Sequence, residues 1–166
     1  MKQLRIILSS LLGTTAMTAY SHSVSAVKGY DFSEPRLLGK MVRNLVHAKH
    51  KKDPMLVGWC MHYLVGLLFA ESYYPLYKRS FRQHPLRGGL VMGGLSGLAA
   101  ILIWKFTVEA HPSPPAMHFP RFAGQLFIAH VVFGLFTMMG FSAADRWLHP
   151  GHRQASLAAQ ESSVIN

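Results

Sequence analysis

Four long apolar runs set the main constraint on the fold of this chain. They cover residues 6–27, 55–77, 89–110 and 122–144. A helix that crosses a lipid bilayer needs about 20 predominantly apolar residues, and each run reaches that length. The four runs therefore predict an all-α fold, an integral membrane four-helix bundle that forms a single membrane domain over residues 1–144. We expect residues 145–166 to form a polar C-terminal tail.

The composition favours a membrane protein over a soluble one. Half of the 166 residues are hydrophobic and 14% are charged, whereas a soluble domain carries about a quarter charged residues. The net charge is +10, but the basic residues fall almost entirely between the apolar runs. We expect these basic loops to contact the anionic headgroups of a lipid bilayer. No zinc-finger spacing or RNA-binding motif accompanies the charge, so no nucleic-acid partner is expected.

The first apolar run has two interpretations. Residues 1–26 have a basic start, an apolar middle and a Val24-Ser25-Ala26 end that a signal peptidase accepts. Three further apolar runs follow, and multi-pass proteins seldom carry a removable signal. We therefore favour a retained first helix over a cleaved signal peptide.

A short amphipathic helix is predicted after the first crossing, over about residues 34–49. Ser33 is suited to cap it, and Glu34 and Pro35 in its first turn are typical start signals. Its apolar residues share one face, which suits a helix lying on the membrane surface; they are Leu37, Leu38, Met41, Leu45 and Val46. The alternative is a solvated basic loop.

By the positive-inside rule, the two orientations in the membrane are equally favoured. If the crossings alternate, eight basic residues lie on each side. The short segment 78–88 has dense positive charge next to two crossings, which slightly favours both termini on the inside.

Polar residues in the apolar runs fall at one depth. In an up-down bundle, six of them lie in the half of the bilayer that faces segments 28–54 and 111–121: His22, His62, Lys105, Glu109, Gln125 and His130. Glycines share helix faces with the histidines and predict close helix packing: Gly58 and Gly66 around His62, and Gly134 after His130. Gly89, Gly93 and Gly97 form a further ridge, which suits packing within the bundle or dimerisation into a homo-oligomer.

Several functions fit this intramembrane polar cluster. The histidines can be structural and bond hydroxyl groups or carbonyls across helix pairs. Because ionisable groups are costly in a bilayer, the cluster can instead relay protons or bind a polar ligand. His62 and His130 are also candidate ligands of haem b or of a transition metal, a redox alternative. No cofactor is expected on the leading interpretation.

No enzyme signature is present. The chain lacks a phosphate-binding glycine loop, a Gly-x-Ser-x-Gly elbow and a His-Glu-x-x-His motif. The single cysteine, Cys60, excludes an internal disulfide and a multi-thiolate metal site. We therefore predict no catalytic residues and a non-enzymatic role, either structural or accessory or in proton-linked transport.

Two segments carry a family resemblance. The segment "VGWCMHYLVGLLFA" and the segment "EAHPSPPAMHFPRFAGQLFIAHVVFGLF", with "LLGTTAMTAYSHSVS" and "EPRLLGKM" before them, resemble small bacterial inner-membrane proteins of the uncharacterised, YagU-like four-helix kind. The resemblance spans most of residues 6–144 and implies a multi-pass protein of the bacterial inner (plasma) membrane. His62 and His130 match its motif positions, and no catalytic role carries over.

Overall fold

The structure is a computed structural model that describes residues 1–46 and 52–148. In these ranges it is helical and contains no strand, which confirms the predicted all-α class. Its α-helices are α1 (Lys2–Lys28), α2 (Glu34–Val46), α3 (Lys52–Leu76), α4 (Pro85–Ala110) and α5 (Phe119–Leu148). A π-helical turn, η1 (Tyr77–Phe81), follows α3 directly. The predicted end of the surface helix, 47–49, and the tail from residue 149 lie outside the described residues.

Three helices are long and apolar enough to cross a membrane. These candidate spans are Asp53–Phe81, Pro85–Ala110 and Phe119–Trp147, and they contain the predicted runs 55–77, 89–110 and 122–144. Within the described ranges α1 does not reach the same level of hydropathy. The reason is its hydroxyl content, since serines and threonines recur along its buried side.

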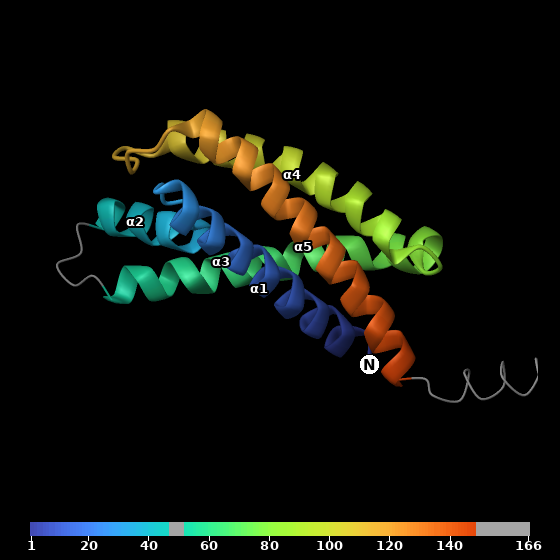
Figure 1. The fold of residues 1–166 in the computed structure, drawn as a ribbon. Coiled ribbons are helices and arrows are strands. Elements are labelled where there is room, and N and C mark those ends of the chain that lie inside the picture. The colour runs from blue at the N-terminus through green and yellow to red at the C-terminus, as the bar shows by residue number, and fades with distance from the viewer. Residues whose placement is uncertain (47–51, 149–166) are drawn as a thin grey trace, which may run out of the picture.

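The helices pack as a row that is bent into two layers (Figure 1). α4 packs on α5, α5 on α1, α1 on α3, and the short α2 on α3. α3 and α4 leave their shared hairpin at the right of Figure 1 and diverge toward the left.

Prolines set the ends of the long helices. Pro75 lies in the last turn of α3, where it cannot donate an N–H bond, and the π-helical turn begins two residues later. α4 starts with Pro85 in its first turn, a position where the missing N–H has no cost. Three further prolines, Pro112, Pro114 and Pro115, keep segment 111–118 out of helix.

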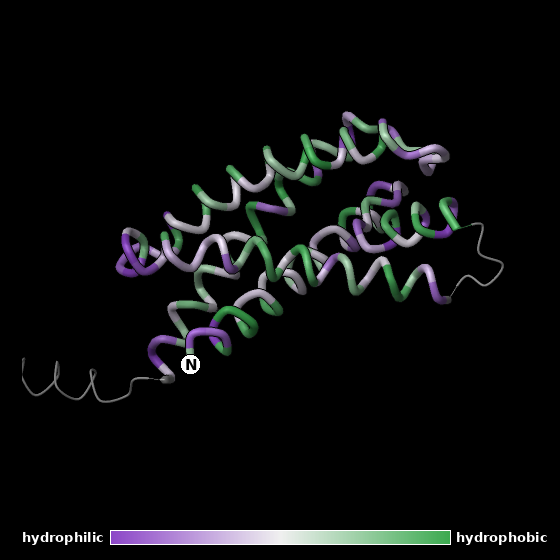
Figure 2. The backbone as a smooth tube through the Cα atoms, turned by 180° about the vertical axis from the view of Figure 1, so that it is seen from behind, coloured by the Kyte–Doolittle hydropathy of each residue, from purple (hydrophilic) through white to green (hydrophobic). Residues whose placement is uncertain are grey.

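The bundle buries polar and small residues beside its aromatic core, and it exposes many large apolar residues. On α1, the buried positions include Ser9, Ser10 and Thr14, whereas its leucines point outward. The outer faces of α3 and α4 are likewise apolar, with Leu64, Leu95 and others exposed. Figure 2 shows hydrophilic residues gathered at the α3–α4 hairpin and near the N-terminus. This pattern is typical of helices surrounded by lipid.

α2 is partly buried in the protein rather than lying free of it. Two residues of its apolar face, Leu37 and Met41, are buried, while Leu45 and Val46 are exposed. The helix packs on the start of α3, where Gly39 and Gly58 bring the two backbones together. The prediction that the side chain of Ser33 caps this helix is wrong, because in the described part of the chain its Oγ forms no hydrogen bond.

Candidate functional site

A cavity of about 110 Å³ lies between the two layers of the bundle. All five helices line it. Its walls are largely aromatic and aliphatic, with a few polar side chains: Thr14, Met17, Glu34, Leu38, His62, Val65, Gly66, Phe69, Ala100, Ile103, Trp104, Thr107, His130 and Phe133. Two of the six predicted cluster residues, His62 and His130, therefore face one cavity.

His62 is held from α1 by a hydrogen bond that defines its tautomer. The Nε2 atom of His62 lies 3.0 Å from Oγ1 of Thr18. The Thr18 hydroxyl donates to the carbonyl oxygen of Thr14 at 2.7 Å, so its single proton is used there. Nε2–H of His62 must then donate to Oγ1 of Thr18. In the neutral ring Nδ1 keeps its lone pair.

His130 leaves the opposite nitrogen free. Its Nδ1–H donates to the carbonyl oxygen of Leu126, one turn back on α5, at 2.9 Å. The neutral ring therefore keeps a lone pair on Nε2. The ring also meets Phe69 edge-on, with centroids 5.7 Å apart. His130 thus adds a second imidazole acceptor to the cavity wall, from α5.

A buried carboxyl group completes the polar part of the wall. Ser21 donates to Oε1 of Glu34 at 2.9 Å and accepts a hydrogen bond from Nε2 of Gln125 at 2.8 Å. The chain Gln125–Ser21–Glu34 joins α5, α1 and α2 beside the cavity. The second carboxyl oxygen, Oε2 of Glu34, is buried and has no hydrogen-bond partner among the described residues.

The burial of Glu34 changes its acid strength. Burial raises the pKa of this carboxyl from 4.5 to about 7, against the opposing effect of hydrogen bonds from the backbone and from Ser21. The nearby Asp31 raises the pKa further. Glu34 therefore exchanges its proton close to neutral pH.

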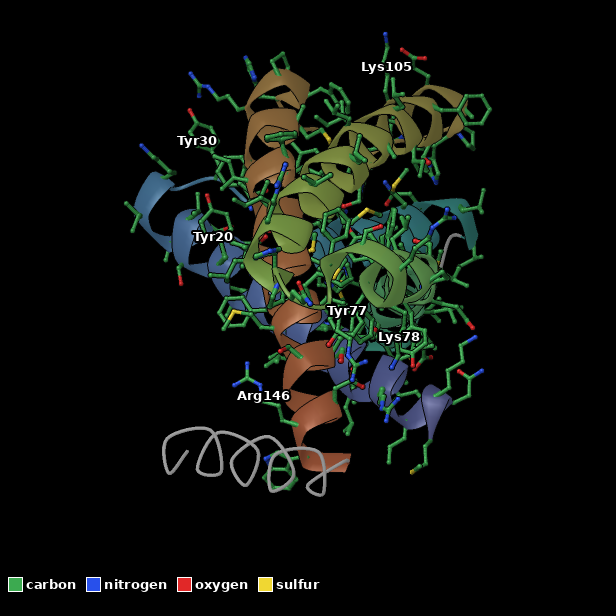
Figure 3. All side chains as sticks on the ribbon, turned by 90° about the vertical axis from the view of Figure 1, so that its right-hand side faces the viewer. Tyr20, Tyr30, Tyr77, Lys78, Lys105 and Arg146 are labelled. Atoms are coloured by element: carbon green, nitrogen blue, oxygen red, sulfur yellow. The ribbon has the colours of Figure 1, made fainter. Side chains whose placement is uncertain are left out.

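The structure separates two of the predicted cluster residues, Lys105 and Glu109, from the cavity. Lys105 and Glu109 point away from the bundle, and Figure 3 shows Lys105 at its outer edge. They face each other at 4.0 Å with side chains 60% and 66% exposed, so the prediction that they join the cluster is wrong. The physical reason is the rotation of α4, which turns Gly93, Gly97 and Trp104 inward.

His22 lies near the cavity without lining it. Its Nδ1–H donates to the carbonyl oxygen of Thr18 at 2.9 Å. Its ring stacks on Trp59 of α3, with centroids 6.1 Å apart. His22 therefore belongs to the contact between α1 and α3.

The glycines singled out in the sequence lie at close helix contacts. A methyl group on Gly134 would sit 2.6 Å from Cα of Gly93, and one on Gly89 would sit 2.6 Å from Cα of Leu135. Gly97 faces Phe127. The glycine ridge of α4 is thus covered by α5 of the same chain. The ridge packs within the bundle, and the expectation that it forms a dimer contact is wrong.

The two glycines beside His62 have different neighbours. Gly66 lies against the side chain of Thr14 on α1, and Gly58 against the backbone of Pro35 and Gly39 on α2. Together they bring three helices close to His62.

The redox alternative fits the cavity poorly. His62 and His130 do line it from facing helices, as shared axial ligands must. However, a haem is far larger than a cavity of about 110 Å³, so it does not fit between the helices as they stand. Within residues 1–46 and 52–148, no three His, Cys, Asp or Glu side chains are grouped to hold a metal ion.

A second buried polar cluster escaped the sequence prediction. Asp145 of α5 is surrounded by three cations, with Arg5 Nε at 3.3 Å, Lys78 Nζ at 3.5 Å and Arg82 Nε at 3.3 Å. The hydroxyl of Tyr77, which lies close to Lys78 in Figure 3, donates to Oδ2 of Asp145 at 3.3 Å. α5 thus continues to Leu148, and the predicted start of the tail at residue 145 is wrong.

No protein-family model, curated protein or solved structure matches the chain. The geometry of the cavity is therefore the basis for the function proposed below.

Proposed function

We propose that this chain is a non-enzymatic, multi-pass membrane protein that exchanges protons at its buried cavity as part of a transport function. The observation that carries the proposal is Glu34. Within residues 1–46 and 52–148, one oxygen of this buried carboxyl has no hydrogen-bond partner, and the group lies on a wall shared with His62 and His130. Ionisable groups buried in this way are costly and are typical of proton pathways.

The proposal includes α1 as a fourth crossing. In support, α1 exposes Leu4, Leu8 and Leu12 while its buried side carries hydroxyl groups. Lipid tolerates such a helix because hydroxyl groups can bond their own backbone, as Thr18 does to Thr14, and can pack against other helices. The four crossings then form a four-helix bundle, and α2 is an amphipathic helix at its edge.

The location in the bacterial inner membrane is proposed on the resemblance of the second and fourth apolar runs to YagU-like proteins. The basic residues of the hairpin support contact with anionic headgroups. Lys78, Arg79 and Arg82 are exposed there, beside the end of a candidate span.

Proton flux into liposomes tests the proposal. The purified protein is reconstituted with a pH-sensitive dye inside the vesicles, and a potassium diffusion potential is imposed. We expect the flux to fall at least about tenfold in His62→Ala, His130→Ala and Glu34→Gln, since each removes a group that exchanges or holds a proton.

Two matched variants control for the loss of a histidine or a glutamate. His84 and Glu71 are exposed and do not line the cavity, so His84→Ala and Glu71→Gln should keep the flux. An unchanged flux in all three cavity variants, with helical circular dichroism also unchanged, would leave these residues a structural role only. A Soret band in the purified protein that is lost in His62→Ala would instead favour the haem alternative.

A further inference from the structure

The cavity wall offers hydrogen-bond acceptors and lacks cationic donors. Oε2 of Glu34 is buried, and no described residue forms a hydrogen bond to it. The tautomers of the two histidines leave Nδ1 of His62 and Nε2 of His130 as acceptors without a hydrogen bond from the described residues. Among the described residues that line the cavity, none is lysine or arginine. The described lining thus holds no cation to pair with an anion, whereas a cationic donor would find up to three acceptors.

The rest of the wall suits an apolar group next to that donor. Phe69 and Phe133 lie beside His130, with ring centroids 5.7 Å and 6.4 Å from its ring. Trp104 lines the cavity from α4. Aromatic rings of this kind attract an organic cation through their faces and bury its apolar part.

The cavity is also accessible from the side of the bundle. Val65 of α3 and Ile103 of α4 line it, yet they are 44% and 56% exposed. Both side chains therefore reach the outer surface of the bundle, each on a candidate membrane span. A molecule that partitions into lipid can therefore enter between these two helices, and a volume of about 110 Å³ limits the enclosed part to a small group.

We propose that the cavity binds a small organic ammonium ion, whose N–H groups donate to Glu34, His62 and His130 while its apolar group packs against Phe69 and Phe133. This inference rests on the proposed function, because it names the substrate class that would be exchanged for protons at the same site. The site would then alternate between two states: a protonated Glu34 without a ligand, and an ionised Glu34 with a bound ammonium ion.

Benzylamine is a suitable probe because it is a cation at neutral pH with one aromatic ring. Its binding to the detergent-purified full chain is measured by isothermal titration calorimetry, without any pH gradient. Benzyl alcohol has nearly the same shape but no charge, and benzoate has the opposite charge. We expect saturable binding of benzylamine, at least about tenfold weaker binding of benzyl alcohol, and no binding of benzoate.

The carboxyl group is tested by substitution and by pH. Glu34→Gln should weaken benzylamine binding at least about tenfold, and Glu71→Gln should leave it unchanged. The wild-type affinity should rise between pH 6 and pH 8, as Glu34 loses its proton, and Glu34→Gln should remove that rise. The other titratable groups near the site are Asp31, His22 of α1, His62 of α3 and His130 of α5. They are present in the wild type and in Glu34→Gln, so the difference between the two pH profiles reports on Glu34.

A second variant keeps the test valid if Glu34→Gln does not fold. Ala100 is buried and lines the cavity from α4, so Ala100→Leu fills space without removing a polar group. It should abolish benzylamine binding, while Ala99→Leu, next to it and outside the cavity lining, should not. Equal binding of benzyl alcohol and benzylamine, or full binding by both Glu34→Gln and Ala100→Leu, would overturn the inference.

The two proposals fail separately. Benzylamine binding without proton flux in liposomes would refute the proposed function of the cavity and leave an amine-binding site. Proton flux without benzylamine binding would refute the amine site and leave the proton function.

Discussion

Arg5 of α1 and Asp145 of α5 form an ion pair, with Nε 3.3 Å from Oδ1 and both side chains only 7% exposed. The pair joins the N-terminal end of α1 to the C-terminal end of α5. Arg5 also donates to the hydroxyl of Tyr74 on α3 at 3.4 Å. Three helices are therefore held at the end of the bundle opposite the cavity.

Removal of Asp145 should strongly destabilise this end of the bundle. In Asp145→Ala, the guanidinium of Arg5 stays buried without its carboxylate and close to Lys78 and Arg82. Breaking a buried ion pair in this way costs about 3–5 kcal/mol. We expect a large fall in the thermal unfolding midpoint in detergent, followed by circular dichroism.

A double variant distinguishes the lost pair from lost packing. Arg5→Met with Asp145→Leu replaces both charges by apolar groups and should recover most of the stability. Arg146→Ala is the surface control, because Arg146 is exposed and only donates to Ser142 at 3.2 Å. A midpoint for Asp145→Ala equal to that of Arg146→Ala would contradict the predicted role of the pair.

Neighbouring glycines of α4 should differ sharply in their tolerance of a methyl group. A methyl group at Gly93 would sit 2.7 Å from the carbonyl oxygen of His130, so α4 and α5 would have to separate. The nearest atom to a methyl group at Gly94 is 3.9 Å away, on the Phe127 ring. Gly93→Ala should destabilise the fold by about 1–3 kcal/mol, and Gly94→Ala should be neutral or slightly stabilising. Equal unfolding midpoints for the two variants would be evidence against close α4–α5 packing.

The apolar runs predicted the helices and the general position of the histidines. His62 and His130 stood out because a histidine in an apolar run is costly unless it has a partner. The rotation of each helix about its own axis could not be predicted in the same way. Lys105 follows the inward-facing Trp104 directly, so a small difference in rotation decides whether it enters the cavity.

The two acidic residues of greatest interest were missed for different reasons. Glu34 lies in a polar segment of the sequence, where it indicates the start of a helix. It becomes buried only because α2 packs back onto α3. Asp145 follows the last apolar residue of its run, so it was assigned to the tail. Its burial depends on contacts with Arg5 and Lys78, which are far away in the sequence.

The bond from His62 to Thr18 should contribute modestly to stability and strongly to proton exchange. Thr18→Val keeps the shape of the side chain and removes the hydroxyl that His62 donates to at 3.0 Å. Interhelical hydrogen bonds in membranes contribute about 0.6 kcal/mol, with a maximum near 1.7 kcal/mol. We expect a small shift in the unfolding midpoint and a clear fall in proton flux. The exposed Thr15→Val serves as the control, and equal flux in the two variants would remove Thr18 from the proton site.

Stability should depend on pH through Glu34. Its pKa is raised from 4.5 to about 7 in the folded protein, so the folded chain binds a proton more tightly than the unfolded chain. The contribution of Glu34 to the free energy of unfolding is therefore greatest below about pH 4.5 and falls as the pH rises to about 7. A shift of this size corresponds to a loss on the order of 3 kcal/mol. Denaturation in detergent from pH 4 to pH 8 measures it: Glu34→Gln should flatten the profile, while Glu71→Gln should keep the wild-type slope. A slope that persists in Glu34→Gln would assign the pH dependence to another group.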